Sequence, residues 1–239
     1  TLAQCEQVLG DTHPDTMTSR NNLAGAYCQA ENLERAIPLL EATLAQCEQV
    51  LGDTHPRTLT NRNNLASAYR SAGDPERAIP LLEATLAQCE QVLGDTHPDT
   101  MTSRNNLAGA YCQAENLERA IPLHETTLAQ RERVLGDTHP DTLRSRRDLA
   151  SVYQAAGDLE RATPLFEITL AQCEQVLGDT HPDTLTSRIN LAGAYCRAED
   201  LERAIPLFAT ALAEVLGDTH PRTLTSRMYL AAAFKDRAR

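Results

Sequence analysis

Residues Leu9–Pro14 read LGDTHP, and this hexapeptide recurs along the whole 239-residue chain. Its copies begin at Leu9, Leu51, Leu93, Leu135, Leu177 and Leu216, so four successive spacings are 42 residues and the last is 39. The blocks 9–50 and 93–134 differ at only four positions. Self-similarity at a fixed period of roughly 20–50 residues is typical of repeat proteins. Each block is therefore predicted to be one structural unit of an array.

The hexapeptide sets the boundaries of a single repeat array. A half repeat is predicted at each end of five full repeats, with boundaries at 1–8, 9–50, 51–92, 93–134, 135–176, 177–215 and 216–239. Both ends fall inside the repeating pattern, so we expect the chain to be a piece of a longer array.

Each block carries the signals of two helices. Pro14 suits the first turn of the first helix, where its missing N–H costs nothing, with Thr12 or His13 as the N-cap. Gly10 suits the left-handed conformation that closes the preceding helix. Apolar residues recur at helical spacing on the first helix and predict its buried stripe, which consists of Leu23, Ala26, Tyr27 and Ala30.

The second helix of each block is predicted to begin after a capping Asn or Asp. These caps are Asn32, Asp74, Asn116, Asp158 and Asp200. The apolar positions of the first copy are Leu33, Ala36, Ile37, Leu40, Leu44, Cys47 and Leu51. A proline follows each cap by about six residues, and an interior proline normally kinks a helix. We expect a bend at Pro38 and its equivalents, because a helix that started at this proline would leave the caps unused.

The composition argues against several classes of protein. The chain has 33 acidic and 22 basic residues and a formal net charge of −11, so it lacks the positive field that holds nucleic acid or an anionic membrane. No apolar run approaches the roughly 18 residues of a membrane span, and no signal-peptide pattern is visible. With 41 % apolar residues the chain can bury a core, which argues against disorder.

Cysteine and histidine do not predict a metal or cofactor site. The seven cysteines are odd in number and fall at two repeat positions, which fits reduced thiols in a cytoplasmic protein rather than a disulfide framework. Each DTHP histidine is one repeat from the next, and helix pairs stack about 10 Å apart, so neighbouring histidines cannot share a zinc ion. We expect these histidines to cap helices, and His124, which replaces a leucine, to be partly exposed.

The run Leu23-Ala24-x-x-Tyr27 followed by Ala36-x-x-x-Leu40 resembles the tetratricopeptide repeat. The 42-residue period with NNLA, AIPL and LGDTHP resembles the kinesin-light-chain type of this repeat, which is common in bacterial signalling proteins. The resemblance implies an all-α, right-handed superhelical solenoid whose inner surface is lined by the first helix of each pair. The sequence departs from the family where large apolar residues are usual and arginines stand instead, at Arg20, Arg62, Arg104, Arg146, Arg188 and Arg227.

A polar stripe marks the predicted inner surface. Thr18, Asn22, Gly25 and Gln29 share one face of the first helix by their spacing. The resemblance implies that the Asn before the Leu bonds the backbone of an extended peptide, a role for which an amide offers both donor and acceptor. The predicted groove residues are Asn21, Asn22, Asn63, Asn64, Asn105, Asn106, Arg144, Arg147, Asp148 and Asn190. Alternatively, these asparagines cap helices or bridge neighbouring repeats.

The fourth repeat departs most from the others. Arg144, Arg147 and Asp148 replace Thr and Asn on the stripe, with Arg146 beside them. An arginine pair can hold a carboxylate bidentately, so we expect an acidic or C-terminal peptide to dock near this repeat. The alternative is a solvated or ion-paired cluster, the commoner fate of surface charge.

The sequence favours a non-enzymatic scaffold that binds a protein or peptide, because no phosphate loop, nucleophile elbow or carboxylate pair stands out. One alternative is a sensor or autoinhibitory arm of a larger bacterial signalling ATPase or regulator, which the resemblance allows. Another is a structural array that stacks head to tail. The two incomplete end helices, with Val8 in the first and Phe234 in the last, carry opposite charge, which would favour that contact.

Overall fold

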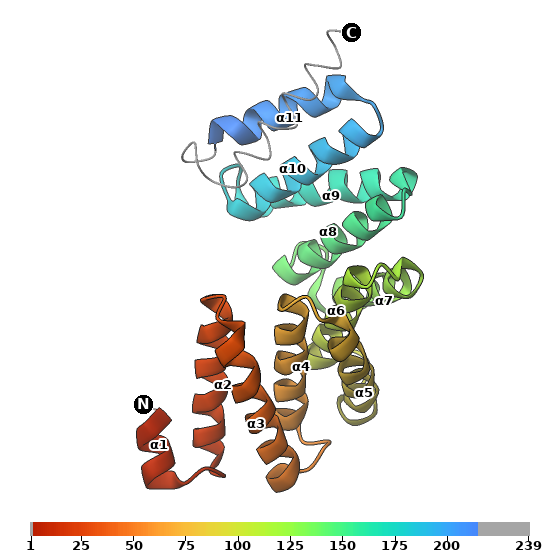
Figure 1. Cartoon of the computed structure of the whole chain (residues 1–239). Helices are drawn as coiled ribbons and strands as arrows, with labels where there is room; N and C mark the ends of the chain where they lie inside the picture. Colours follow the sequence, from red (N-terminus) through yellow and green to blue (C-terminus); the bar gives the residue numbers. More distant parts are fainter. Residues whose placement is uncertain (1, 215–239) are drawn as a thin grey trace. The chain divides into compact units, whose positions relative to one another are not determined.

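The computed structural model describes residues 2–214, and every regular element in that range is an α-helix (Figure 1). The first helices of the repeats are α2 (Pro14–Gln29), α4 (Pro56–Ser71), α6 (Pro98–Gln113), α8 (Pro140–Ala155) and α10 (Pro182–Arg197). The second helices are α3 (Leu33–Leu51), α5 (Pro75–Leu93), α7 (Leu117–Leu135), α9 (Leu159–Leu177) and α11 (Leu201–Glu214), and α1 (Leu2–Leu9) precedes them. The all-α class and the repeated helix–turn–helix unit are confirmed.

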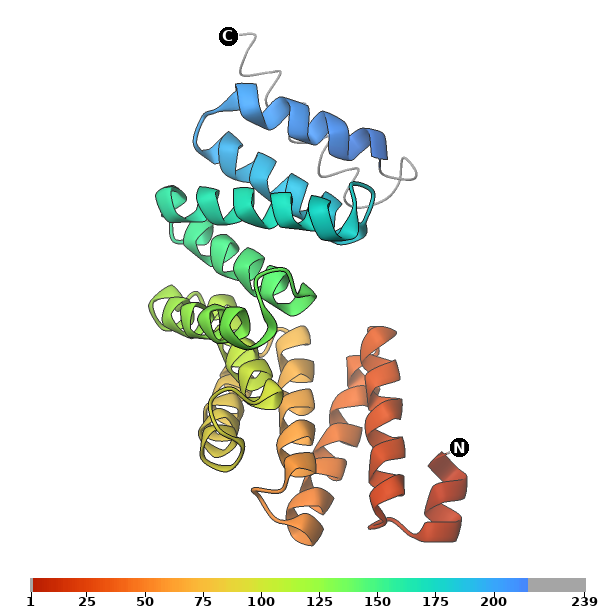
Figure 2. The ribbon, with the colours of Figure 1, turned by 180° about the vertical axis from the view of Figure 1, so that it is seen from behind.

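The described residues form two compact units, and the boundary after residue 123 falls within α7. In the first unit each helix from α1 to α5 packs against the next one along the chain, so that α3 contacts both α2 and α4. The first helices α2 and α4 also touch directly (Figure 2). In the second unit α8, α9, α10 and α11 repeat this arrangement. The predicted terminal half repeat, 216–239 with Arg227 and Phe234, lies outside the described residues.

Histidine caps the first helix of each described repeat. The Nδ1 atom of His13 accepts a hydrogen bond from the backbone N–H of Asp15 at 3.2 Å, and Pro14 occupies the first turn. Equivalent bonds are made by His55, His97, His139 and His181. The cap is therefore the histidine and not the preceding threonine, and one backbone donor of each helix start is satisfied.

The glycine after each second helix has positive φ, but it is not the left-handed residue that we predicted. Gly52 has φ 86° and ψ 165°, and Gly94 has φ 84° and ψ 163°. This region is essentially restricted to glycine, whereas the left-handed helical region has ψ near 47°. A second position with positive φ lies directly before the cap of the second helix and is Glu31 in the first repeat, with φ 56°.

The second helices begin at the predicted caps and run through their prolines. Asn32 Oδ1 accepts from the backbone N–H of Arg35 at 3.3 Å, and Pro38 lies inside a continuous helix. The alternative, in which the helix starts at the proline, is wrong, because the preceding turn is helical and capped. The bend at this position stays a prediction.

The core follows the predicted stripe of the second helix at Ala36, Leu40, Leu44 and Cys47, which are buried. The stripe predicted on the first helix is wrong for the first repeat: Leu23 and Tyr27 are half-buried and Ala26 is exposed, since the described helix α1 that precedes them has only eight residues, whereas the equivalent positions of α4 are buried. Ala30 is exposed because it is the C-cap of α2 rather than part of the stripe. His124 is buried, at 4 % exposure, because it occupies the leucine position that faces the core.

The five described arginines at these apolar positions are buried, and each forms an ion pair with a partly exposed glutamate of the preceding helix. Arg62 is 6 % exposed, and its guanidinium contacts Glu48 at 2.6 Å and Gln88 at 2.5 Å. The same carboxylate contact, at 2.6–2.7 Å, is made by the pairs Arg20–Glu6, Arg104–Glu90, Arg146–Glu132 and Arg188–Glu174. We call this set the arginine ladder. A buried guanidinium requires such partners, which explains why arginine can stand in an apolar position.

A second recurring cluster joins each of the first helices α4, α6, α8 and α10 to two second helices. The Tyr69 hydroxyl donates to Glu41 at 2.5 Å, Arg77 contacts the same carboxylate at 2.9 Å, and its guanidinium carbon lies 4.0 Å from the ring centroid of Tyr69. Equivalent clusters contain Tyr111, Glu83 and Arg119; Tyr153, Glu125 and Arg161; and Tyr195, Glu167 and Arg203. These clusters occupy tyrosine, glutamate and arginine in structural contacts.

Candidate functional site

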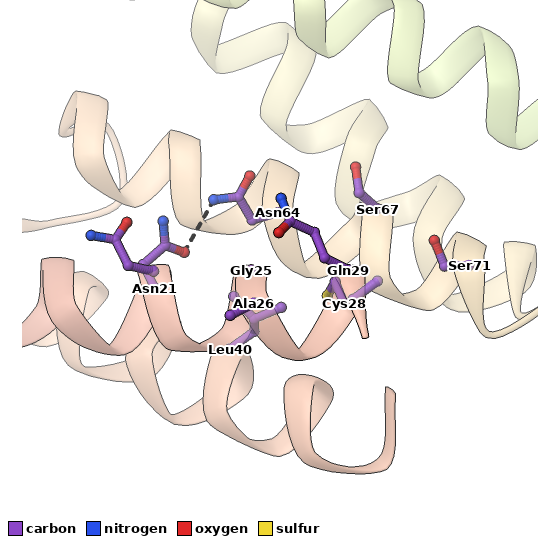
Figure 3. Close-up of a pocket in the computed structure, with 11 residues that line it drawn as sticks. Asn21, Gly25, Ala26, Cys28, Gln29, Leu40, Asn64, Ser67 and Ser71 are labelled. Atoms are coloured by element: carbon purple, nitrogen blue, oxygen red, sulfur yellow. Dashed lines mark hydrogen bonds between the residues drawn. The ribbon is translucent and has the colours of Figure 1, made fainter. Parts of the chain in front are cut away.

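A hollow of about 430 Å³ opens between the first helices α2 and α4 (Figure 3). It is lined by Asn21, Asn22, Gly25, Ala26, Cys28, Gln29, Leu40, Asn64, Ser67, Ala68 and Ser71. None of these residues is charged, and their polar groups are amides, hydroxyls and one thiol. Such a surface can donate and accept hydrogen bonds without imposing a charge on what it binds.

The hollow exists because the facing side chains are short. A Cβ atom added at Gly25 would meet no atom within 4 Å. Cys28 on α2 and Ser71 on α4 are too short to bridge the two helices. Figure 3 shows Gln29, Ser67 and Ser71 along its wall. The small volume of the side chains at these positions leaves room that a ligand can fill.

The structure brings some predicted groove residues together as bridges between repeats. Asn64 Nδ2 donates to Asn21 Oδ1 at 3.1 Å, as Figure 3 shows. Asn63 is 7 % exposed, and its Oδ1 accepts from the Ser103 hydroxyl at 3.1 Å. These contacts match the alternative that we left open, in which asparagines bridge neighbouring repeats. They also fix the amides of Asn21 and Asn64 at one end of the hollow.

The other predicted asparagines differ in exposure. Asn22 is exposed and lines the hollow. Asn105, Asn106 and Asn190 are half-buried on α6 and α10. The backbone carbonyl of Asn106 is already used, because it accepts a hydrogen bond from Arg70. Of the predicted asparagines in the first unit, Asn22 on α2 is therefore the one that is exposed.

We call the place where two successive first helices face each other a junction. The next junction in the same unit, between α4 and α6, is closed by two side chains. Arg70 Nη1 donates to the Asn106 carbonyl at 3.2 Å and lies so close to Gly109 that an added Cβ would stand 2.5 Å from it. Gln113 Nε2 donates back to the Arg70 carbonyl at 3.2 Å. Arg197 makes the equivalent bond to the Gln154 carbonyl between α8 and α10, also at 3.2 Å.

The arginine cluster of the fourth repeat is largely ion-paired. Arg146, which lies beside them in the sequence, is buried in the arginine ladder with Glu132 and Gln172. Arg147 pairs with Asp183 at 3.4 Å, and Arg144 lies 3.7 Å from Asp141. Arg144 and Arg147 line a much smaller hollow together with Asp183. A carboxylate ligand there would compete with the chain's own aspartate. Asp148 is half-buried on α8.

Three of the seven thiols are buried in the core. Cys47, Cys89 and Cys173 are buried, and burial raises the pKa of each thiol, so the thiolate is disfavoured. Within residues 2–214, no three His, Cys, Asp or Glu side chains gather in a way that could hold a metal ion. In the same range, no helix combines the length and apolar character needed to cross a membrane.

One feature of the site was readable in the sequence but was missed. The small residue of the first helix alternates between Gly25, Ser67, Gly109, Ser151 and Gly193. The alternation matches the structure, because Arg70 of the second repeat lies against Gly109 of the third. Comparing positions between alternate repeats, rather than between neighbours, would have revealed a two-repeat pattern.

Comparisons with known proteins agree with this architecture. A sequence model described as Tetratricopeptide repeat matches residues 15–91, 63–125, 99–167 and 147–213. A kinesin-light-chain-like protein of Podospora anserina, solved as nearly identical TPR-like repeats, shares 32 % identity; the match covers 84 % of this chain and 96 % of that chain, with a TM-score of 0.75. Comparison with curated protein sequences gave no match.

Two further solved structures share the fold at lower identity. BtubC from P. vanneervenii is 20 % identical over 89 % of each chain, with a TM-score of 0.75. A signal transduction ATPase from Pyrococcus horikoshii with a tetratricopeptide repeat sensor is 18 % identical over 92 % of this chain and 31 % of that chain, with a TM-score of 0.71. Helix pairs, repeat motif and matched family together lead to one assignment: the chain belongs to the tetratricopeptide repeat family, with repeats similar to those of kinesin light chains.

Proposed function

We propose that this chain is a non-enzymatic protein-interaction scaffold that binds an extended peptide along its first helices. Membership of the tetratricopeptide repeat family implies the scaffold. The observation that supports the peptide groove is the uncharged hollow between α2 and α4, lined by Asn21, Asn22, Gln29 and Asn64. A peptide backbone presents alternating donors and acceptors, which amide side chains can satisfy together.

The test is a peptide selection with a matched variant. A library of random extended peptides displayed on phage is selected against the whole chain, and the affinities of the enriched peptides are measured by fluorescence polarisation. Asn22→Ala should weaken them about tenfold, the effect of losing a well-formed hydrogen bond in a desolvated groove. Gln49→Ala, an exposed amide on α3, should leave them unchanged. Peptides that bind equally to the wild type and Asn22→Ala would contradict the groove.

Asn105, Asn106 and Asn190 belong to the same proposal as continuations of the peptide path in their own units. The carboxylate site at Arg144 and Arg147 is a separate proposal, weakened by the pairing of Arg147 with Asp183. If Arg144→Ala combined with Arg147→Ala leaves the binding of every acidic peptide in the selection unchanged, that site is excluded.

Two alternatives keep specific support. The sensor-arm alternative rests on the Pyrococcus horikoshii ATPase, whose 18 % identity shows similarity of fold. Head-to-tail stacking rests on the opposite charge of the two predicted end segments and is tested by sedimentation velocity at increasing concentration and salt. In the sensor-arm alternative the occupant of the groove would be another domain of the same protein. The free cysteines support a cytoplasmic location as part of the proposal.

A further inference from the structure

We infer that the hollow between α2 and α4 is a subsite for an arginine side chain of the bound peptide. The inference deepens the proposed peptide-binding function and rests on it. What supports it is an arginine of the chain itself, which occupies the equivalent place one junction further on.

Arg70 shows how a guanidinium fits between two first helices of this repeat. Its Nη1 atom donates to the backbone carbonyl of Asn106 at 3.2 Å and lies against Gly109. Gln113 anchors the backbone of the same arginine from the other side. The α4/α6 junction is thus filled by a guanidinium that reaches across from α4 to α6.

The α2/α4 junction has the same arrangement of helices but lacks the two long side chains that fill the α4/α6 junction. Cys28 stands 42 residues before Arg70, and Ser71 stands 42 residues before Gln113. Both side chains are too short to cross the gap, and both line the hollow. By the same register, the carbonyl of Asn64 holds the place of the Asn106 carbonyl that receives Arg70. The space that Arg70 fills at one junction is open at the other.

The chemistry of the walls favours a guanidinium over other side chains. No lining residue carries a positive charge, and oxygen acceptors are provided by Asn22, Gln29, Ser67 and Ser71. A guanidinium offers five donors in a flat fork, so it can use several of these acceptors at once, whereas an ammonium presents a compact point charge. The chain's net charge of −11 further favours a basic ligand.

One difference between the junctions changes where the guanidinium would sit. Ser67 replaces Gly109, so a ligand arginine cannot press against the α4 backbone as Arg70 presses against α6. The Cβ of Ser67 shifts the guanidinium outward, and its hydroxyl becomes an acceptor within the hollow. The hollow therefore suits the arginine of a bound peptide better than it would suit an arginine placed on α2 in the position of Cys28.

The experiment uses the whole chain and three acetylated, amidated peptides, Gly-Ser-X-Ser-Gly, in which X is arginine, lysine or citrulline. Binding is followed by NMR titration of the side-chain amide signals of Asn22, Gln29 and Asn64. The arginine peptide should bind about tenfold more tightly than the other two, the gain expected from charge-assisted hydrogen bonds. Citrulline keeps the shape and loses the charge, and lysine keeps the charge and loses the fork.

Variants swap the two junctions. Cys28→Arg combined with Ser67→Gly reproduces the α4/α6 junction and should abolish binding of the arginine peptide. Ser71→Gln closes the hollow from the opposite helix and gives the same result if the first variant fails to fold. Arg70→Cys combined with Gln113→Ser removes both side chains that close the α4/α6 junction, so it should open a second site and raise the stoichiometry from one to two. Gln49→Ala, which removes an exposed amide of α3 outside the hollow, is the control and should leave the affinity unchanged.

The outcomes separate the subsite from the proposed function. Equal binding of the three peptides, an absence of shifts with all of them, or unchanged binding in a folded closed variant overturns the arginine subsite. If phage-selected peptides depend on Asn22 but show no arginine preference, the groove stands and the subsite falls. If the arginine peptide binds at the hollow while no selected peptide depends on Asn22, the subsite stands and the extended groove falls.

Discussion

The junction between α2 and α4 and the junction between α4 and α6 are built from the same 42-residue unit, yet one is hollow and the other is filled. The difference comes down to Cys28 and Ser71 at the first junction and Arg70 and Gln113 at the second. Both junctions share the arginine ladder, with Arg62 and Arg104 in equivalent contacts. Near-identical repeats can therefore keep one packing frame while a few inner side chains decide where space is left.

The comparison implies that substitutions in the arginine ladder and substitutions at the junctions change the stability of the chain by very different amounts. The largest effect is expected for Arg62→Ala, which should lower the free energy of unfolding by about 3 kcal/mol. The buried guanidinium leaves behind Glu48 and Gln88 without their donor, although Glu48 keeps part of its hydration because its side chain is 37 % exposed. Urea unfolding followed by circular dichroism measures the change.

Arg57→Ala is the matched control for this prediction. Arg57 lies on the same helix and is exposed, so its loss should change the unfolding free energy by less than about 0.5 kcal/mol. Equal effects of the two substitutions would show that the arginine ladder is no more important than a surface charge. In that case the two junctions would not share the frame on which their comparison depends.

Much of this frame could be predicted from the sequence. The period, the Asn and Asp caps and the proline after His13 each act locally, so their structural role follows from a few neighbouring residues. The arginine ladder could not be predicted in this way. Arg62 contacts Glu48 and Gln88, which lie 14 and 26 residues away, and an arginine in an apolar position gives no hint of its partners.

The candidate site was predicted only in part, for a similar reason. The polar stripe with Asn22 was located correctly as an exposed face, because helical spacing is enough to place it. Whether the stripe encloses a hollow depends on pairs such as Arg70 and Gly109, which face each other across two helices and lie 39 residues apart. The lengths of such facing side chains become meaningful only when the register of the helices is known.

The next-largest effect is expected at the tyrosine clusters. It tests whether the alternation between even and odd repeats extends to them. Burial, together with the hydrogen bond to its glutamate, raises the pKa of Tyr69 and of Tyr153 to about 12, and the pKa values of Tyr111 and Tyr195 are also raised. The stacked arginine is closer in the even repeats, at 4.0 Å for Tyr69 against 5.5 Å for Tyr111.

A raised phenol pKa stabilises the fold below the ordinary tyrosine value of about 10, and this contribution is lost as the pH rises from 10 toward 12. We expect the urea midpoint to fall over that range, and the fall to be smaller in a variant with Tyr69→Phe and Tyr153→Phe. The same pair of substitutions at Tyr111 and Tyr195 should reduce it less. If the urea midpoint falls equally with pH in the wild type and in both double variants, the alternation is limited to the inner face, which the first helices line.

The smallest effect is the sharpest test of the two junctions themselves. Gly25→Ala should stabilise the chain by about 1 kcal/mol, because alanine is the better helix former and its Cβ meets open space. Gly109→Ala has the same intrinsic gain, but its Cβ would stand 2.5 Å from Arg70 Nη1, so the guanidinium must leave the Asn106 carbonyl. The loss of that hydrogen bond, about 1 kcal/mol, should cancel the gain.

A double-mutant cycle isolates the cause of this difference. In an Arg70→Ala background, Gly109→Ala should recover the stabilisation seen for Gly25→Ala, because the obstructing guanidinium is gone. Gly193→Ala, whose Cβ also meets open space, should stabilise without any second change. If Gly109→Ala stabilises the wild type as strongly as Gly25→Ala does, then Arg70 does not hold the α4/α6 junction closed. The arginine subsite inferred at α2/α4 would then lose the internal guanidinium on which it is based.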